Sequence, residues 1–316
     1  MNTTRLSHSF LRDKAVLLLA ALSLSLFSCS SDNSDDVAVS NVPNGQYTSL
    51  STDLKAMAAS PTLKTMLVAH RANTYSGIQD DIPENSIPGI ERCIEEGVDM
   101  IEIDPRATSD GVLILMHNAK LDATTTSTGA INAQTYRIIQ SHYLTVNGKV
   151  TKYRIPTLSE ALDAAKDRIY VCIDVKEKEW LTDIVKMVVE KGMTDQVCYY
   201  TGEDTSYLDV ILNVDKNGIL LPWVSYGNII PQLHMQYPSL MMFQTGIGYS
   251  AIDQMLSEAR SEGIVNYVNY LDYDDKMLEG DFSKLDDFIS KGIQVMQSDY
   301  CDLLIPKMKE GGYNIR

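Results

Sequence analysis

Ionisable side chains stand directly after several short apolar runs of this sequence. Four such runs lie before residue 180, and they read Leu67-Val68-Ala69-His70-Arg71, Met100-Ile101-Glu102-Ile103-Asp104, Leu113-Ile114-Leu115-Met116-His117-Asn118 and Val171-Cys172-Ile173-Asp174-Val175-Lys176. A strand that is buried on both faces tolerates charge only at its ends, because a buried unpaired charge is very costly. We therefore expect these side chains to meet where neighbouring parallel strands end.

Three carboxylates within this set have a spacing that suits metal binding. Glu102 and Asp104 are two residues apart on a predicted strand, so both side chains point to the same face. Asp174 and Lys176 repeat that spacing two predicted strands later. One carboxylate alone is better explained as a salt bridge or a helix cap, but three at one rim repel each other. The set therefore indicates one divalent cation, and oxygen ligands favour Mg²⁺ or Ca²⁺ over zinc.

Two histidines, His70 and His117, flank the carboxylates in this arrangement. A single histidine at a strand end is more often structural than catalytic. A pair beside a carboxylate cluster is typical of a general acid and a general base, because imidazole titrates near neutral pH. The sequence leaves open which of the two is the acid. His142 and His234 lack such surroundings, and we assign them no role.

The elements that must position these residues are short apolar runs alternating with amphipathic segments. Nine runs have strand character: residues 66–69, 98–103, 112–116, 169–175, 197–201, 219–224, 240–243, 265–271 and 293–296. This alternation predicts an α/β fold of the (β/α)₈ TIM-barrel type, in which the carboxyl ends of the strands form the active-site face. A doubly wound open sheet is the rival, but no helix opens with a Gly-rich phosphate-binding pattern. Nine candidates exceed eight positions, so at least one lies outside the barrel or is wrong.

Residues 1–28 have the features of a secretory signal. Arg5, Arg12 and Lys14 precede an apolar run at residues 15–27, and small residues follow it. The run is shorter than the roughly 20 apolar residues that a membrane-spanning helix needs. We therefore expect this segment to direct export of the chain.

The end of that signal, Leu26-Phe27-Ser28-Cys29, resembles the lipobox of bacterial lipoproteins, in which the cysteine is acylated. An ordinary cleavable signal with an incidental cysteine is the alternative. We predict lipidation at Cys29, an acidic tether over residues 29–50 and a single catalytic domain over residues 51–316. The protein would then be lipid-anchored to a bacterial membrane, on its periplasmic face or at the cell surface.

The charge of the chain excludes some classes of partner. Its formal net charge is −15, which disfavours binding to nucleic acid and to anionic membranes by electrostatic attraction. An anionic substrate needs its charge met locally, by a cation or a few placed bases. The cysteines after residue 29 have neither zinc-like nor redox spacing, and we interpret them as small buried side chains: Cys93, Cys172, Cys198 and Cys301. The oligomeric state stays open.

With these residues in place, the pattern resembles the glycerophosphodiester phosphodiesterase family over roughly residues 66–176. The matching segments, in order, are His70-Arg71, Pro83-Glu84-Asn85-Ser86, Gly97-x-Asp99-x-x-Glu102-x-Asp104, Thr108-x-Asp110-Gly111, His117-Asn118, Leu121-x-x-Thr124-Thr125-Thr126, Ile155-Pro156-Thr157-Leu158-x-Glu160 and Ile173-Asp174-Val175-Lys176. The resemblance implies a barrel enzyme that hydrolyses a small glycerophosphodiester to an alcohol and glycerol 3-phosphate with one divalent cation.

The resemblance also implies roles for individual residues. His70 and His117 match the acid/base pair, and Glu102 and Asp104 match metal ligands. Asp174 stands where the family usually has Glu, and its shorter side chain leaves binding through a water as an alternative. We expect the metal ligands to be these three carboxylates.

Three further residues match positions near the substrate phosphate. Arg71 and Lys176 match basic residues that would offset developing negative charge. Glu84 matches the acidic residue of the family's Pro-Glu-Asn segment, which is either a ligand or a substrate contact. We assign all three to substrate or phosphate binding.

The chain departs from the family pattern at two positions. Ala72 replaces the glycine expected after His70-Arg71, and Asn118 replaces the Asp that commonly follows the second histidine. The first change predicts a different path for the loop, and the second reduces the charge support for His117. Gln297-Ser298-Asp299 stands where the family often has a Thr-Asp pair.

Two other functions remain as alternatives. A related phospholipase D-like barrel acts on intact phospholipid or sphingolipid, and a large hydrophobic lid would favour it. The Tyr-rich stretch 267–273 is a weak candidate for such a lid. A non-catalytic lipoprotein that binds phosphodiesters is the other alternative, but both histidines and all three carboxylates are present, which argues against a decayed site.

Overall fold

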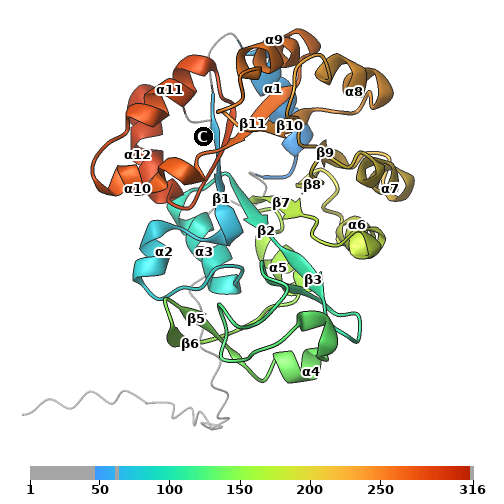
Figure 1. Ribbon diagram of the computed structural model, residues 1–316, viewed down its shortest axis with the longest axis vertical. Coiled ribbons are helices and arrows are strands. Elements are labelled where there is room, and N and C mark those ends of the chain that lie inside the picture. The colour runs from blue at the N-terminus through green and yellow to red at the C-terminus, as the bar shows by residue number, and fades with distance from the viewer. Residues whose placement is uncertain (1–46, 61–63, 314–316) are drawn as a thin grey trace, which may run out of the picture. The chain divides into compact units, whose positions relative to one another are not determined.

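A sheet of eight parallel strands forms the centre of the protein (Figure 1). The computed structural model describes residues 47–60 and 64–313 of the chain, so the predicted signal, Cys29 and most of the tether lie outside the described residues. The eight strands are β1 (Met66–Ala69), β2 (Met100–Ile103), β7 (Tyr170–Asp174), β8 (Val197–Tyr200), β9 (Ile219–Leu221), β10 (Met242–Thr245), β11 (Val265–Asn269) and β12 (Val295–Ser298).

The sheet closes on itself. Its strand order is β10-β11-β12-β1-β2-β7-β8-β9, which leaves β9 and β10 at the two edges. The chain just after β9 joins these edges: the backbone N–H of Val224 donates to the carbonyl of Gln244 at 2.8 Å, and the N–H of Gln244 donates to Pro222 at 2.9 Å. The predicted (β/α)₈ barrel is therefore confirmed.

Helices surround the barrel and join its strands (Figure 1). They are α1 (Leu50–Ala59), α2 (Tyr75–Gln79), α3 (Ile87–Glu96), α5 (Leu158–Ala165), α6 (Leu181–Glu190), α7 (Ser206–Val214), α8 (Ile230–Gln236), α9 (Ile252–Glu262), α10 (Asp274–Leu278), α11 (Ser283–Lys291) and α12 (Cys301–Gly311), with 3₁₀ turns η1 (His70–Ala72), η2 (Ile131–Ala133), η3 (Lys178–Trp180) and η4 (Leu271–Tyr273). α5 begins with a capping box between Thr157 and Glu160, as its sequence indicates. Among the described residues, no helix combines the length and apolarity needed to cross a membrane.

The side chains of each barrel strand alternate between two cores. Met66 and Val68 belong to an inner cluster, while Leu67 and Ala69 pack toward the surrounding helices. Residues of α1 join the inner cluster, among them Leu50, so this helix closes one end of the barrel. Leu50 and the buried Tyr47 fall within the range that the sequence assigned to the tether, so the folded domain begins a few residues before residue 51.

An insertion separates β2 from β7 and forms a small lobe at one side of the barrel (lower part of Figure 1). Its elements are β3 (Pro105–Ala107), β4 (Leu113–Leu115), α4 (Tyr136–Ile139), β5 (Tyr143–Val146) and β6 (Lys149–Arg154). β3 pairs with β4 and β5 with β6, both antiparallel.

The predicted strand at residues 112–116 lies in this insertion and not in the barrel, which resolves the ninth candidate. Its centre forms β4, in which Leu113 and Leu115 pack against the main core. Ile114, together with Met116 just after the strand, enters a separate core of the insertion. Because both faces of β4 are covered, its sequence is as apolar as that of a barrel strand. The four cysteines named above are free and buried, as expected.

Candidate active site

Three carboxylates meet at the carboxyl ends of β2 and β7. Met100 and Cys172 face the inner core, so the same alternation turns Glu102 and Asp174, two residues later, into the mouth of the barrel. Asp104 follows β2 directly. One oxygen from each of the three carboxylates lies within 4.8 Å of the others. The structure therefore brings together the three residues that the sequence assigned to the metal.

Burial and mutual repulsion oppose the ionisation of two carboxylates of this cluster, Glu102 and Asp174. Burial, and then the charges of Asp104 and Asp174, raise the pKa of Glu102 well above its usual value. Burial also raises the pKa of Asp174, although Lys176 opposes the shift. The three carboxylates offer only oxygen ligands, lie close together and repel one another when ionised. Such a set fits a hard divalent cation, whose charge would offset that repulsion. Glu102, Asp104 and Asp174 are the residues that would hold it.

Lys176 lies among these carboxylates. Its ammonium is 2.9 Å from Oδ1 of Asp104 and also pairs with Asp174. Burial disfavours the charge on Lys176, but the two carboxylates outweigh burial and raise its pKa. Asp104 responds in the opposite sense: burial tends to raise its pKa, and Lys176 and Asn85 bring it below the usual value.

Backbone and amide groups fix the orientation of the ligands. The backbone N–H of Arg71 donates to Oε2 of Glu102 at 2.8 Å. Asn85 holds Asp104 twice, because its Nδ2 donates to Oδ2 at 2.7 Å and its Oδ1 accepts from the Asp104 backbone N–H at 3.1 Å. Sequence reasoning gave Asn85 no role, although it belongs to the Pro83-Glu84-Asn85-Ser86 segment.

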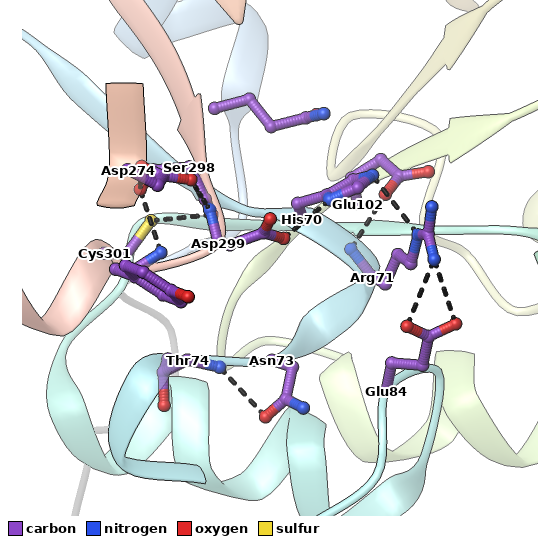
Figure 2. Close-up of polar contacts among 12 residues, drawn as sticks. His70, Arg71, Asn73, Thr74, Glu84, Glu102, Asp274, Ser298, Asp299 and Cys301 are labelled. Atoms are coloured by element: carbon purple, nitrogen blue, oxygen red, sulfur yellow. Dashed lines mark hydrogen bonds and ion pairs between the residues drawn. The ribbon is translucent and has the colours of Figure 1, made fainter. Parts of the chain in front are cut away.

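His70 begins the turn η1 at the end of β1, and Asp299 holds its ring (Figure 2). The distance from Nδ1 of His70 to Oδ1 of Asp299 is 2.7 Å. Nε2 of His70 lies 3.3 Å from Nε of Arg71, a group that can only donate. The signal that could have identified Asp299 is its place in the segment that matches the family's Thr-Asp pair.

Arg71 forms an ion pair with Glu84 through a single nitrogen, Nη1, which lies 3.2 and 3.1 Å from the two carboxylate oxygens (Figure 2). Glu84 is therefore next to the barrel mouth but is not part of the carboxylate cluster. Arg71 and Ala72 both have left-handed backbones, with φ of 53° and 49°. Such strained residues cluster at functional sites. Gly89 is required beneath this turn, because a Cβ there would lie 2.3 Å from the Ala72 carbonyl oxygen.

His117 reaches the same mouth from the insertion and not from a barrel strand, which corrects the route that the sequence suggested. Its Nδ1 lies 2.9 Å from Oδ1 of Asn118. His117 is half-buried, as His70 is, whereas Asn118 is exposed. Arg106 on β3 fixes the backbone here: its Nε donates to the carbonyl of His117 at 2.9 Å, and its Nη1 pairs with Glu177 at 2.9 Å. Sequence reasoning missed Arg106, which no spacing rule distinguishes.

Two cavities open at this rim. The first, of about 200 Å³, is lined by His70, Glu102, His117, Asp174 and Lys176 together with barrel side chains such as Gln244. The second, of about 290 Å³, is lined by His70, Arg71, Glu84 and Asp299, and by the insertion residues Thr124, Thr145, Asn147 and Gly148. His70 faces both cavities, so a ligand near it has room on either side.

Fold and site together define a (β/α)₈-barrel hydrolase with two histidines and an acidic cluster suited to a metal ion at the barrel mouth. Residues 70–213 match the model of the glycerophosphoryl diester phosphodiesterase family. Over these residues, the chain matches that family, as its sequence resemblance suggested.

Relatives and solved structures agree with this assignment. A glycerophosphodiester phosphodiesterase of Caldanaerobacter subterraneus subsp. tengcongensis is 28% identical over 199 residues, which are 54% of this chain and 80% of that protein. A glycerophosphoryl diester phosphodiesterase structure from Parabacteroides distasonis has a TM-score of 0.75 at 20% identity and covers 86% of this chain and 95% of its own. An Oleispira antarctica phosphodiesterase in complex with the product sn-glycerol-3-phosphate has a TM-score of 0.61 at 17% identity, covering 78% and 97%.

Proposed function

We propose that this protein hydrolyses glycerophosphodiesters to an alcohol and glycerol 3-phosphate, with a divalent cation and with His70 and His117 as the acid/base pair. The observation that carries the proposal is that both histidines line one cavity with Glu102 and Asp174, two of the three carboxylates of the cluster. Two features of relatives support it: the similar proteins are named for this activity, and the Oleispira antarctica enzyme was solved with glycerol 3-phosphate.

The residues of the chain suggest how the reaction proceeds. The cation, held by Glu102, Asp104 and Asp174, would withdraw charge from the phosphate and fix its orientation. One histidine accepts a proton from the attacking oxygen, which belongs to a water or to the glycerol hydroxyl of the substrate, as that oxygen bonds to phosphorus. The other donates a proton to the departing alcohol oxygen as the phosphorus–oxygen bond breaks. If the glycerol hydroxyl attacks, water then opens the cyclic phosphate to give glycerol 3-phosphate. Lys176 and Arg71 offer positive charge on two sides of His70, where they would stabilise the phosphate oxygens.

The intact-lipid alternative receives less support from the molecule. The cavities are small and lined largely by charged or polar side chains, which suits a short, polar ester better than an acyl chain. Tyr267 and Tyr270, in the stretch considered as a lid, are buried in the core and leave no hydrophobic flap there.

The test of the proposed function uses the purified protein with a panel of glycerophosphodiesters and intact phospholipids, with and without chelator. Chelation should abolish turnover, and adding back Mg²⁺ or Ca²⁺ should restore it. Binding of either ion relieves the repulsion among the carboxylates, so the melting temperature should rise as well, with about 2.7 kcal/mol of stabilisation at a hundredfold excess over Kd. Full activity in excess chelator, with no thermal shift on adding the ions back, would refute the metal assignment.

We further propose export and lipid anchoring through Cys29, on the strength of the lipobox-like segment and the polar residues after it. Two or more acyl chains are needed for stable membrane attachment, so the acylated protein should sediment with membranes. Cys29→Ala should remain uncleaved or become soluble. Recovery of the wild-type protein free in the medium and without lipid would contradict the anchor.

A further inference from the structure

The two catalytic histidines of the proposed mechanism have unequal partners. His70 contacts a carboxylate, Asp299, whereas His117 contacts the amide of Asn118. The sheet register explains the first contact: Ala69 at the end of β1 is paired with Ser298 at the end of β12, so the next residues, His70 and Asp299, leave the barrel side by side.

Asp299 is itself held from behind by a buried carboxylate, Asp274 (Figure 2). The backbone N–H of Asp299 donates to Oδ2 of Asp274 at 2.7 Å, and the Ser298 hydroxyl donates to Oδ1 at 2.6 Å. The backbone N–H of Tyr300 in turn donates to the Ser298 hydroxyl oxygen at 2.9 Å. Asp274, at the start of α10, is only 3% exposed. The turn that presents Asp299 is therefore fixed at three consecutive residues.

The contacts of the His70 ring define where its proton lies. Nε of Arg71 can only donate, so Nε2 of His70 accepts from it and carries the lone pair. Nδ1 then carries the proton and donates it to Asp299. A neutral imidazole whose Nε2 lone pair is held only by the long contact to Arg71, and whose Nδ1 faces a carboxylate, is arranged to accept a proton once Arg71 is displaced.

We propose that Asp299 is a positioning residue that makes His70 the general base, that Asp274 holds Asp299 in place, and that His117 is the acid. This proposal rests on the proposed function and resolves which histidine does which. The attacking hydroxyl displaces Arg71 from Nε2 and transfers its proton there while its oxygen bonds to phosphorus. Nδ1 keeps its proton, and Asp299 stabilises the resulting imidazolium. His117 protonates the leaving alkoxide, and solvent exchange restores both rings.

The first test is kinetic and uses the full-length protein. Asp299→Ala should lower kcat roughly 10- to 100-fold, the scale of loss for a misplaced catalytic group, with little change in KM. Asp299→Glu should recover part of the loss. A nitrophenyl ester, whose leaving group needs no proton, should not rescue Asp299→Ala, but it should rescue His117→Ala. Asp274→Asn should cause a smaller loss of kcat, about tenfold or less.

The chain offers a matched control in another histidine–carboxylate pair. Nδ1 of His234 lies 2.8 Å from Oε2 of Glu262, between α8 and α9. Glu262→Gln should leave kcat unchanged. If Glu262→Gln lowered kcat as much as Asp299→Ala does, the loss would be a general effect of removing a histidine–carboxylate pair, and the proposal would be wrong.

The second test does not depend on turnover. Selective ¹⁵N labelling of histidine should show His70 protonated at Nδ1 in the wild-type protein, with a strongly deshielded proton that Asp299→Ala abolishes and Glu262→Gln leaves in place. Protonation of neutral His70 at Nε2, wild-type kcat in Asp299→Ala, or rescue of that variant by the nitrophenyl ester would each overturn the proposal. If the wild-type protein cleaves no phosphodiester, the proposed function fails, and the NMR result still decides whether Asp299 sets the tautomer.

Discussion

The two sides of the barrel mouth are built differently. His70 extends from a barrel strand, its side chain is 16% exposed, and its ring partner is a carboxylate fixed by the next strand of the sheet. His117 follows β4 of the insertion, is half-buried, and has a neutral amide partner from the adjacent residue. One side is fixed by the closure of the sheet, and the other depends on how a separate lobe packs.

This difference suggests which parts of the site are free to vary. The barrel side holds the carboxylate cluster and His70, and any shift there would move several strands at once. The insertion side supplies His117 and part of the second cavity from a lobe with its own small core. We expect changes in the insertion to alter substrate choice and the protonation of the leaving group, while the barrel side keeps the reaction the same.

The largest expected effect comes from removing each histidine. His70→Ala and His117→Ala should each lower kcat by about 10²–10⁴-fold on a natural glycerophosphodiester. Neither residue is assigned as a metal ligand, so both variants should still show the thermal shift with Mg²⁺ or Ca²⁺. Only one of the two should recover on the nitrophenyl ester. Near wild-type turnover in both would remove the catalytic assignment and favour a protein that only binds phosphodiesters.

A second prediction concerns the stability of the His70 side as a function of pH. Burial is the main cause that raises the pKa of Asp274 from 3.8 to about 7. Between pH values of about 4 and 7, the Asp274 carboxyl is ionised in the unfolded chain but stays largely protonated in the folded protein. Its contribution therefore lowers the free energy of unfolding as pH rises from about 4 to 7. Asp274→Asn removes the effect, and its stability relative to the wild type should rise across that window by on the order of 3 kcal/mol.

Urea denaturation of both proteins at several pH values measures this difference directly. An unchanged difference between pH 4 and pH 8 would mean that Asp274 ionises as easily in the folded protein as in the unfolded chain. Glu262→Gln again provides the control, because Glu262 lies in a half-exposed pair on the helical surface.

The smallest effect should follow from loosening the insertion side. Arg106→Met removes the donor to the His117 carbonyl and the ion pair to Glu177. We expect kcat to fall roughly tenfold, within the range that a small misplacement of a catalytic group produces. Arg168→Met breaks a similarly buried ion pair, with Glu91, and serves as the control. Equal losses of kcat in both variants would indicate general destabilisation and not a role for Arg106 in placing His117.

The sequence by itself determined the architecture and most of the site. Apolar runs ending in His70, Glu102, Asp104, Asp174 and Lys176 were sufficient to predict a barrel with a metal-binding rim, because buried strands accept charge only at their ends. The same local reasoning identified His117 as a catalytic candidate, although it placed the residue after a barrel strand. The apolar pattern of β4 indicates only that both faces of the strand are buried, and it does not distinguish a barrel strand from a strand of the insertion.

Only the tertiary structure decided which residues support that chemistry. Asp299 reaches His70 because β12 pairs with β1 across more than two hundred residues of sequence, and Asp274 and Arg106 act through contacts that no local spacing encodes. Side-chain periodicity specifies which face of a strand a residue occupies, but the identity of the neighbouring strand depends on how the whole sheet closes. The proposed catalytic groups could therefore be named from the sequence, and the asymmetry between the two histidines could not.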